Sequence, residues 1–254
     1  MSTATAAAPR IVNAAAHRRF HDDGFTCVPD CVPRDEALHL RAAALYVSAQ
    51  PAPGTLLSGD GVFRQLVNVW QHDAQMRSLT FHPRLLQVVN ELAGRPMRLW
   101  HDQILIKQPK NGFATEFHQD LPYWPIARDT FTISTWIALG DVLEQSGSMA
   151  FLPGSHRLKG DASNLSDPRS LVSQHPELAF VERCGFPMRA GGATFHQGYT
   201  AHRALANDTD EARVAHIVIW IDAAARCDGK PHCVIDGLGM KAGDEFPADI
   251  CPLI

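Results

Sequence analysis

The chain has 254 residues, a length that suits one large domain or at most two. Hydrophobic residues make up 45% of the sequence, and the net charge of −4 without any basic run argues against a disordered or nucleic-acid-binding chain. No apolar stretch is long enough to span a bilayer, and the N-terminus lacks the pattern of a signal peptide. We therefore expect a cytoplasmic protein, monomeric or homodimeric, whose partner is a small molecule rather than a nucleic acid or a membrane.

Helical signals dominate the first part of the chain. The spacing of apolar residues, together with end signals from proline and glycine, predicts helices over residues 11–23, 33–48 and 82–93 and a short strand over residues 25–28. From residue 98 onward the apolar residues alternate with period two. Gly, Pro, Asn and Asp clusters divide this part into predicted strands at 98–107, 116–120, 131–139, 149–152, 188–195 and 213–222.

This order of elements predicts a mainly β protein with a helical layer. The core is expected to be a double-stranded β-helix, that is, a cupin-like jelly roll. We expect a single domain over residues 1–254, with a mainly helical N-terminal layer (1–97), a jelly-roll core (98–222) and an irregular tail (223–254). The polar stretch 159–174 is expected to be a surface insertion or a lid.

A histidine and an aspartate two residues apart, His118 and Asp120, carry the strongest chemical signal. Side chains alternate along a strand, so this spacing would place both on one face of the predicted strand 116–120. One imidazole and one carboxylate are two thirds of the facial triad of non-haem Fe(II) oxygenases. The pair by itself also occurs on ordinary surface strands. A third ligand is therefore needed, and His202 and His196 compete for that position.

Arg213 begins a strongly apolar predicted strand, where an arginine needs an explanation. If its side chain points inward beside Ala215 and Ile217, it would be costly to bury without an anion. A guanidinium can bind a carboxylate through two parallel hydrogen bonds. The alternative is that Arg213 lies at the exposed end of the strand and reaches water.

Several motifs, in this order and spacing, resemble the phytanoyl-CoA dioxygenase family of Fe(II)/2-oxoglutarate-dependent oxygenases. They are QILIK at 103–107, HQDLPYWP at 118–125, WIAL at 136–139, GSMAFLPGSH at 147–156, and HRALAN at 202–207 followed by Arg213. The resemblance implies that His118, Asp120 and His202 bind iron. The separation of eleven residues between His202 and Arg213 matches the family, whereas the seventeen from His196 does not.

The resemblance also implies the cosubstrates and their contacts. The open face of the iron would bind 2-oxoglutarate and O2, and Arg213 would bind the distal carboxylate of 2-oxoglutarate. Gln103 and Trp136 match further 2-oxoglutarate contacts of the family, although core packing also explains Trp136. Weaker expectations place Tyr123, Trp124, Trp70 and Arg64 around the substrate.

The implied activity is that of a dioxygenase that hydroxylates an unactivated C–H bond of a small metabolite or natural-product intermediate and releases succinate and CO2. Asp120 favours oxygen transfer, because related halogenases carry a small residue in its place. Desaturation, epimerisation and ring formation are alternatives within the same chemistry. A jelly-roll hydrolase or isomerase using another metal, or a non-catalytic cupin-like module, is the alternative of a different class.

Overall fold

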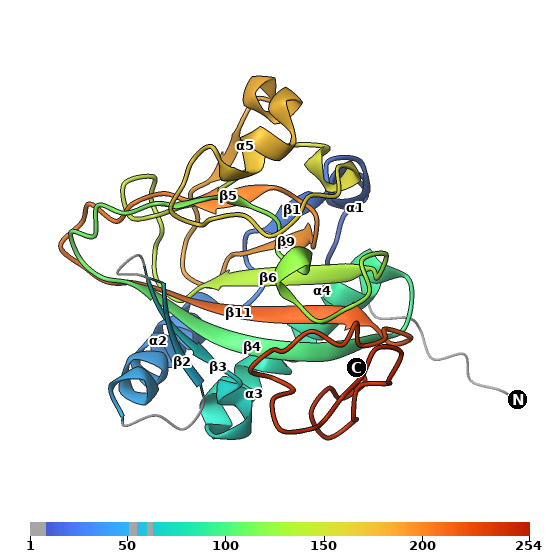
Figure 1. The fold of residues 1–254 in the computed structure, drawn as a ribbon. Coiled ribbons are helices and arrows are strands. Elements are labelled where there is room, and N and C mark those ends of the chain that lie inside the picture. The colour runs from blue at the N-terminus through green and yellow to red at the C-terminus, as the bar shows by residue number, and fades with distance from the viewer. Residues whose placement is uncertain (1–8, 51–54, 60–62) are drawn as a thin grey trace, which may run out of the picture.

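The computed structural model describes residues 9–50, 55–59 and 63–254, and two antiparallel sheets organise them (Figure 1). The larger sheet has the order β1 (Phe25–Val28), β9 (Ala193–Gln197), β6 (Thr132–Ala138), β11 (Arg213–Asp222), β4 (Met97–Lys107), β3 (Phe63–Val67), β2 (Thr55–Gly59). The smaller has the order β5 (Thr115–His118), β10 (His202–Ala204), β7 (Met149–Phe151), β8 (Cys184–Phe186). The predicted mainly β fold with a jelly-roll core is confirmed.

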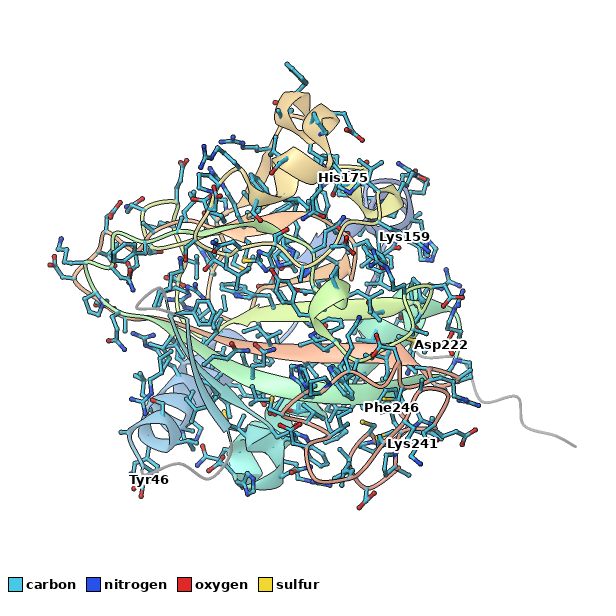
Figure 2. The ribbon with its side chains drawn as sticks, viewed as in Figure 1. Tyr46, Lys159, His175, Asp222, Lys241 and Phe246 are labelled. Atoms are coloured by element: carbon cyan, nitrogen blue, oxygen red, sulfur yellow. The ribbon has the colours of Figure 1, made fainter. Side chains whose placement is uncertain are left out.

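Helices cover the outer face of the larger sheet, and Figure 1 shows α2 and α3 on the side away from β5. The four helices of this layer are α1 (Ala14–Asp22), α2 (Arg34–Ala49), α3 (Ala74–Thr80) and α4 (Pro83–Ala93). The bounds of α4 follow from its ends: Pro83 occupies the first turn, and Gly94 adopts φ 60° after the last. The outer surface of α2 faces solvent, as Tyr46 in Figure 2 illustrates.

Shorter helical segments lie in the loops. They are η1 (Val69–Gln71), η2 (Leu121–Tyr123), η3 (Ser155–Arg157), α5 (Ser170–Gln174) and η4 (Pro176–Phe180). In the described part of the chain, no helix is both long and apolar enough to cross a membrane.

The period-two pattern of β11 divides the core into two layers. Val214 and Val218 pack with the helices, while Ala215 and Ile217 pack with residues of the smaller sheet such as Phe151. The space between the two sheets is therefore reached from β11 by every second side chain, beginning with residue 213.

Two predicted strands differ from the observed ones by more than one residue at an end. The strand predicted at 116–120 ends at His118, and Asp120 has helical backbone angles (φ −74°, ψ −48°) because η2 begins immediately after it. The strand predicted at 188–195 begins only at Ala193. Gly191 adopts φ 88° before it, and a Cβ there would lie 2.1 Å from the carbonyl oxygen of Val32, so the chain turns at this glycine.

The sequence patterns did not predict several elements of the two sheets and of the helical layer. These are the strands β2, β3, β8 and β10 and the helix α3. All four strands have only three to five residues, and α3 has seven, so no long periodic run marked them.

The segment 223–254 forms turns and isolated bridges and packs across β4. The amide of Leu99 donates a hydrogen bond to the carbonyl of Pro252 at 2.9 Å. Phe246, labelled in Figure 2, packs edge-on against Trp100 with ring centroids 5.0 Å apart. This segment therefore closes one end of the space between the sheets.

Candidate metal centre and cosubstrate pocket

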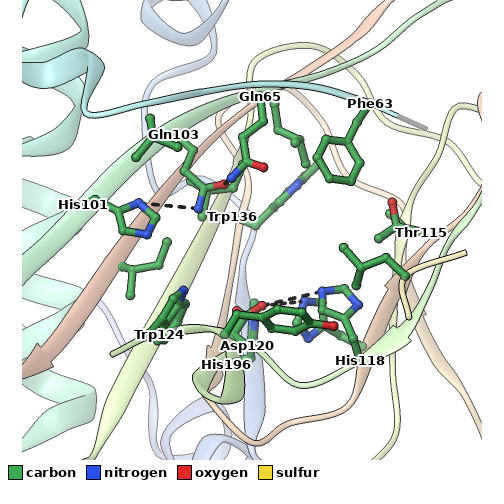
Figure 3. A pocket seen from close by; sticks show the side chains of 18 of the residues that line it. Phe63, Gln65, His101, Gln103, Thr115, His118, Asp120, Trp124, Trp136 and His196 are labelled. Carbon is green, nitrogen blue, oxygen red and sulfur yellow. Dashed lines mark hydrogen bonds and ion pairs between the residues drawn. The ribbon is translucent and has the colours of Figure 1, made fainter. Parts of the chain in front are cut away.

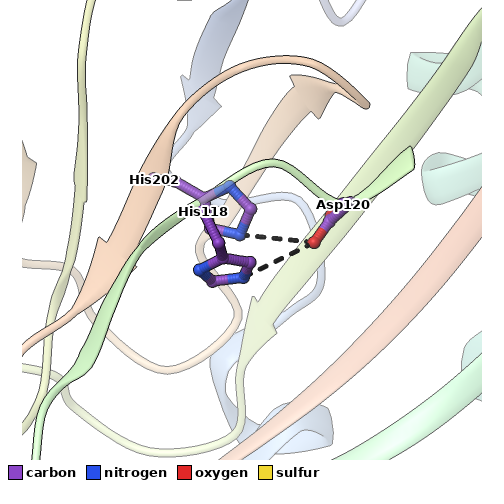
Figure 4. Close-up of side chains that lie close together, drawn as sticks. All are labelled: His118, Asp120 and His202. Atoms are coloured by element: carbon purple, nitrogen blue, oxygen red, sulfur yellow. Dashed lines mark ion pairs between the residues drawn. The ribbon is translucent and has the colours of Figure 1, made fainter. Parts of the chain in front are cut away.

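Two histidines and one aspartate converge at the smaller sheet (Figure 4). β5 and β10 pair antiparallel with His118 opposite His202, and the two ring centroids lie 4.3 Å apart. The Oδ1 atom of Asp120 lies 3.6 Å from the Nε2 atom of each histidine. The three ligand atoms all lie within 4.8 Å of one another, so one metal ion can bind all three. The aspartate joins them through the η2 turn rather than through the strand alternation that we expected.

Backbone carbonyls determine which nitrogen of each histidine faces this cluster. Nδ1 of His118 lies 2.7 Å from the carbonyl oxygen of Glu116, and Nδ1 of His202 lies 3.0 Å from that of Thr200. A carbonyl only accepts, so each Nδ1 carries the proton and each Nε2 keeps its lone pair. Burial lowers the pKa of His118 and of His202 to about 4. Both rings are therefore neutral near pH 7, as metal-binding imidazoles must be.

The carboxylate of Asp120 is held by two further side chains. Burial would raise its pKa, but His202, His196 and His118 outweigh burial and hold the pKa well below its usual range. Ser134 Oγ donates to Oδ2 of Asp120 at 2.6 Å, and Nε2 of His196 lies 3.1 Å from the same oxygen. His196 thus contacts the outer oxygen of the carboxylate, and Oδ1 is left for the cluster. Two neutral imidazoles and a carboxylate fit Fe(II).

Arg213 is buried at the start of β11, with 3% of its surface exposed. This excludes the alternative in which its side chain reaches water. Its Nε and both terminal nitrogens have no hydrogen-bond partner among the described residues, and burial lowers the pKa of Arg213 to about 10. The guanidinium carbon lies 5.3 Å from the ring centroid of Trp136. A buried, unpaired cation of this kind fits the carboxylate of a bound dicarboxylic acid.

Trp136 and Gln103 flank Ile217 of β11, Trp136 from β6 and Gln103 from β4. Trp136 is 2% exposed, and its Nε1 has no partner among the described residues. Nε2 of Gln65 donates to Oε1 of Gln103 at 2.6 Å. Trp136 and Gln103 line the cavity that also contains the triad, as the cosubstrate roles implied by the resemblance require.

The cavity has a volume of about 250 Å³ and lies between the two sheets (Figure 3). Tyr123 and Trp124 line it, as expected of substrate-contacting residues. The structure places Arg64 and Trp70 outside it. Arg64 alternates on β3 with the lining residues Phe63 and Gln65 and so faces the other way. Trp70 packs on the helical side of the sheet, with its ring centroid 5.5 Å from that of Phe81.

Several lining residues were missed by sequence reasoning. His101 shares one face of β4 with Gln103, and this alternation is the signal that could have identified it. His232 and Cys233 line the cavity from the irregular segment 223–254, where no pattern marked them. Only the folded chain brings these two residues next to β4.

The stretch 159–174 lies against the turn that carries Asp120. The amide of Gly160 donates to Oε1 of Gln119 at 2.8 Å, and the Tyr123 hydroxyl donates to the carbonyl of Ser163. Leu165 receives a 2.9 Å hydrogen bond from the amide of Glu116 at its carbonyl and lines the cavity. This stretch therefore covers the cavity beside the triad.

Known proteins share this fold and these motifs. The sequence profile described as phytanoyl-CoA dioxygenase (PhyH) matches residues 20–215. Phytanoyl-CoA dioxygenase domain-containing protein 1 of Mus musculus is 28% identical over 162 residues, covering 60% of this chain and 55% of that protein. The chain thus spans about half the length of the curated relatives it matches.

Two solved structures are similar over almost their whole length. One is the non-haem alpha-ketoglutarate-dependent carbocyclase SnoK from nogalamycin biosynthesis, with a TM-score of 0.83 and 29% identity over 96% of each chain. The other is the epimerase SnoN in complex with Fe3+, alpha ketoglutarate and nogalamycin RO, with a TM-score of 0.82 and 30% identity. That match covers 94% of this chain and 97% of SnoN. On the extent of the profile match, the chain belongs to the phytanoyl-CoA dioxygenase (PhyH) family.

Proposed function

We propose that this protein is an Fe(II)/2-oxoglutarate-dependent oxygenase that hydroxylates an unactivated C–H bond of a small natural-product intermediate. The observation that carries the proposal is Arg213, a buried guanidinium without a described partner. It stacks on Trp136, which lines the same cavity as the triad. A hydrolase, an isomerase or a binding module would have no use for this cation, whereas 2-oxoglutarate supplies the missing anion.

Different residues of the chain bind the iron and the cosubstrate. His118, Asp120 and His202 would hold the iron, and all three line the cavity in which the cosubstrate would bind. Arg213 binds the distal carboxylate of 2-oxoglutarate, and Trp136 shields that ion pair from water. When bound, iron and 2-oxoglutarate supply the oxidising chemistry. The reaction balances as substrate C–H plus 2-oxoglutarate plus O2 giving C–OH, succinate and CO2, with one oxygen atom in each of the hydroxyl and succinate.

The lining of the cavity supports an uncharged substrate. Arg213 lies behind Trp136 and is assigned to 2-oxoglutarate. Among the described residues no lysine and no other arginine lines the cavity, so the phosphates of a CoA thioester would meet no free counter-charge there. Most of the lining is apolar or aromatic, as is usual for small-molecule sites. The complex of the similar protein SnoN with nogalamycin RO supports a natural-product intermediate as the substrate class.

Oxidative ring closure is the second candidate, because SnoK, a carbocyclase, matches over 96% of both chains. In this reaction two hydrogen atoms leave the substrate, a bond forms between the two atoms that lost them, and the second oxygen atom ends in water. The mass of the product separates the two outcomes: hydroxylation adds one oxygen atom, whereas ring closure removes two hydrogen atoms.

The activity is tested on protein purified without oxygen. Addition of Fe(II) and 2-oxoglutarate should give the visible charge-transfer absorption of their chelate, and admission of O2 should yield succinate. Asp120→Ala should lose both signals and keep its circular dichroism spectrum, while Arg18→Ala, on the exposed face of α1, should keep both. Wild-type protein that gives neither the absorption band nor succinate would contradict the proposal.

A further inference from the structure

Gln119 lies in the sequence between two of the three candidate iron ligands, yet its side chain is not among those that line the cavity. The residue is completely buried. A buried primary amide needs acceptors for its two N–H groups and a donor for its oxygen. Gln119 finds these partners in two segments that are distant from it in the sequence.

Three hydrogen bonds satisfy this amide. Nε2 of Gln119 donates to the carbonyl oxygen of Leu158 at 2.6 Å and to that of Tyr199 at 2.7 Å. Its Oε1 atom accepts from the amide of Gly160 at 2.8 Å. A carbonyl only accepts and a backbone amide only donates, so these partners determine which atom of the side chain is the nitrogen. The side chain thus joins its own turn to residues 158–160 and to the turn at Tyr199.

The hydrogen bond to Tyr199 connects Gln119 with the third ligand. The carbonyl oxygen of the next residue, Thr200, lies 3.0 Å from Nδ1 of His202 and accepts its proton. That carbonyl therefore sets the orientation of the His202 ring. Gln119 holds the turn that carries Asp120 against the segment that orients His202, through contacts that do not include the metal.

The hydrogen bonds to Leu158 and Gly160 hold residues 158–165, which we call the cover segment. Leu165 of this segment lines the cavity, and the amide of Ser163 donates to the Tyr123 hydroxyl at 3.0 Å. A Cβ at residue 160 would lie 2.8 Å from Oε1 of Gln119. The close approach therefore depends on glycine, and a larger residue would push the cover segment away from the amide.

We propose that Gln119 is a positioning residue that couples closure of the cover segment to occupation of the iron site. Resting on the proposed function, Fe(II) holds Asp120 and His202 in one arrangement, and this arrangement presents the amide of Gln119 to the cover segment. Coupling between two sites is reciprocal, so the closed cover segment also strengthens iron binding. Gln119 itself contacts neither the iron nor 2-oxoglutarate.

Hydrogen exchange, measured by mass spectrometry without oxygen, tests the coupling in the unaltered protein. Fe(II) should slow the exchange of peptides from the cover segment several-fold, because closure protects the amides of Gly160 and Ser163. Peptides from α4, on the far side of the larger sheet, should exchange at the same rate with and without Fe(II). Cover-segment exchange that does not respond to Fe(II) would overturn the proposal.

Gln119→Leu removes all three hydrogen bonds at similar side-chain volume. This variant should lose the response of the cover segment and bind Fe(II) about 10-fold more weakly in a metal titration. Gln87→Leu is the matched control, since Gln87 hydrogen-bonds the Pro9 carbonyl and Glu91 at α4. It should keep both the response and the affinity. A Gln119→Leu protein with a lower Tm but the response and affinity of wild type would show a purely structural role and reject the proposal.

Gly160→Ala separates the two parts of the coupling and also serves if Gln119→Leu does not fold. It displaces the cover segment and leaves the hydrogen bond between Gln119 and Tyr199 in place. Its cover segment should exchange rapidly with or without Fe(II), and its Fe(II) affinity should fall less than that of Gln119→Leu. A Gly160→Ala protein whose cover segment still responds to Fe(II) would contradict the proposal.

Succinate formation and the charge-transfer band are measured in the same preparations. Their presence together with an unresponsive cover segment rejects only the role of Gln119. A responsive cover segment without succinate or the band supports the coupling and rejects the proposed oxygenase function. Wild-type protein that binds no Fe(II) rejects both.

Discussion

Replacing Arg213 by methionine should stabilise the protein in the absence of 2-oxoglutarate and remove the stabilisation that 2-oxoglutarate gives. Methionine fills a similar length of the buried space without a charge. The reason is that Arg213 is buried and its guanidinium has no hydrogen-bond partner among the described residues. Burial of this unpaired cation lowers the stability of the protein without 2-oxoglutarate, and it leaves the guanidinium free to bind a carboxylate.

The size of the effect follows from the pKa of Arg213. Burial lowers it from 12.5 to about 10, and at 1.36 kcal/mol per pKa unit this corresponds to about 3 kcal/mol of unfavourable burial. The contact between the guanidinium and Trp136, which the substitution removes, offsets about 1–2 kcal/mol of that. We therefore expect a net gain of about 1–2 kcal/mol, or roughly 2–8 °C in Tm for a chain of this size.

Thermal unfolding without oxygen, with Fe(II) and with or without 2-oxoglutarate, measures both parts. At 100 times its Kd, 2-oxoglutarate should stabilise wild-type protein by about 2.7 kcal/mol and Arg213→Met hardly at all. Arg213→Lys keeps the charge but loses the two-pronged geometry, so it should bind 2-oxoglutarate more weakly and gain no stability. Arg18→Met, on the exposed face of α1, should change stability by less than about 0.5 kcal/mol. A destabilised Arg213→Met protein that still responds fully to 2-oxoglutarate would refute this reasoning.

Three further outcomes are expected. Ser134→Ala removes the 2.6 Å hydrogen bond to Asp120 and should weaken Fe(II) binding about 10-fold, measured by metal titration, with little change in Tm; unchanged affinity would argue against this support. Removal of iron by a chelator should abolish succinate formation, and added Fe(II) should restore it. Burial raises the pKa of Asp102 from 3.8 to about 7, so its contribution to stability, up to about 4 kcal/mol, should be present below pH 4 and lost as the pH rises to 7. Denaturant titrations should show wild-type protein losing stability relative to Asp102→Asn over that range, and parallel curves would contradict the assignment.

Periodicity predicted the long elements because their burial repeats over many residues. The strand predicted at 213–222 agrees with β11 at both ends, and the helix predicted at 82–93 differs from α4 by one residue. Short strands gave no comparable signal. β10 has three residues and carries His202, yet its place between β5 and β7 depends on pairing with residues far away in sequence.

The sequence by itself determined the family, the fold class and a compact set of candidate ligands. Residue types suited to iron and to a carboxylate stand at characteristic spacings, and chemistry restricts which side chains serve there. Their geometry came from tertiary structure: Asp120 joins the histidines through a 3₁₀ turn, and His196 contacts the outer oxygen of Asp120.

Which residues line the end of the cavity near His101 was determined by tertiary structure alone. Trp70 and Arg64 are the right residue types for a substrate site but face the helical layer or the other side of β3. His232 comes from an irregular segment that packs back across β4 and places its ring against His101. Such a segment has no repeating burial pattern, because each of its residues meets a different neighbour, and only the folded chain specifies those neighbours.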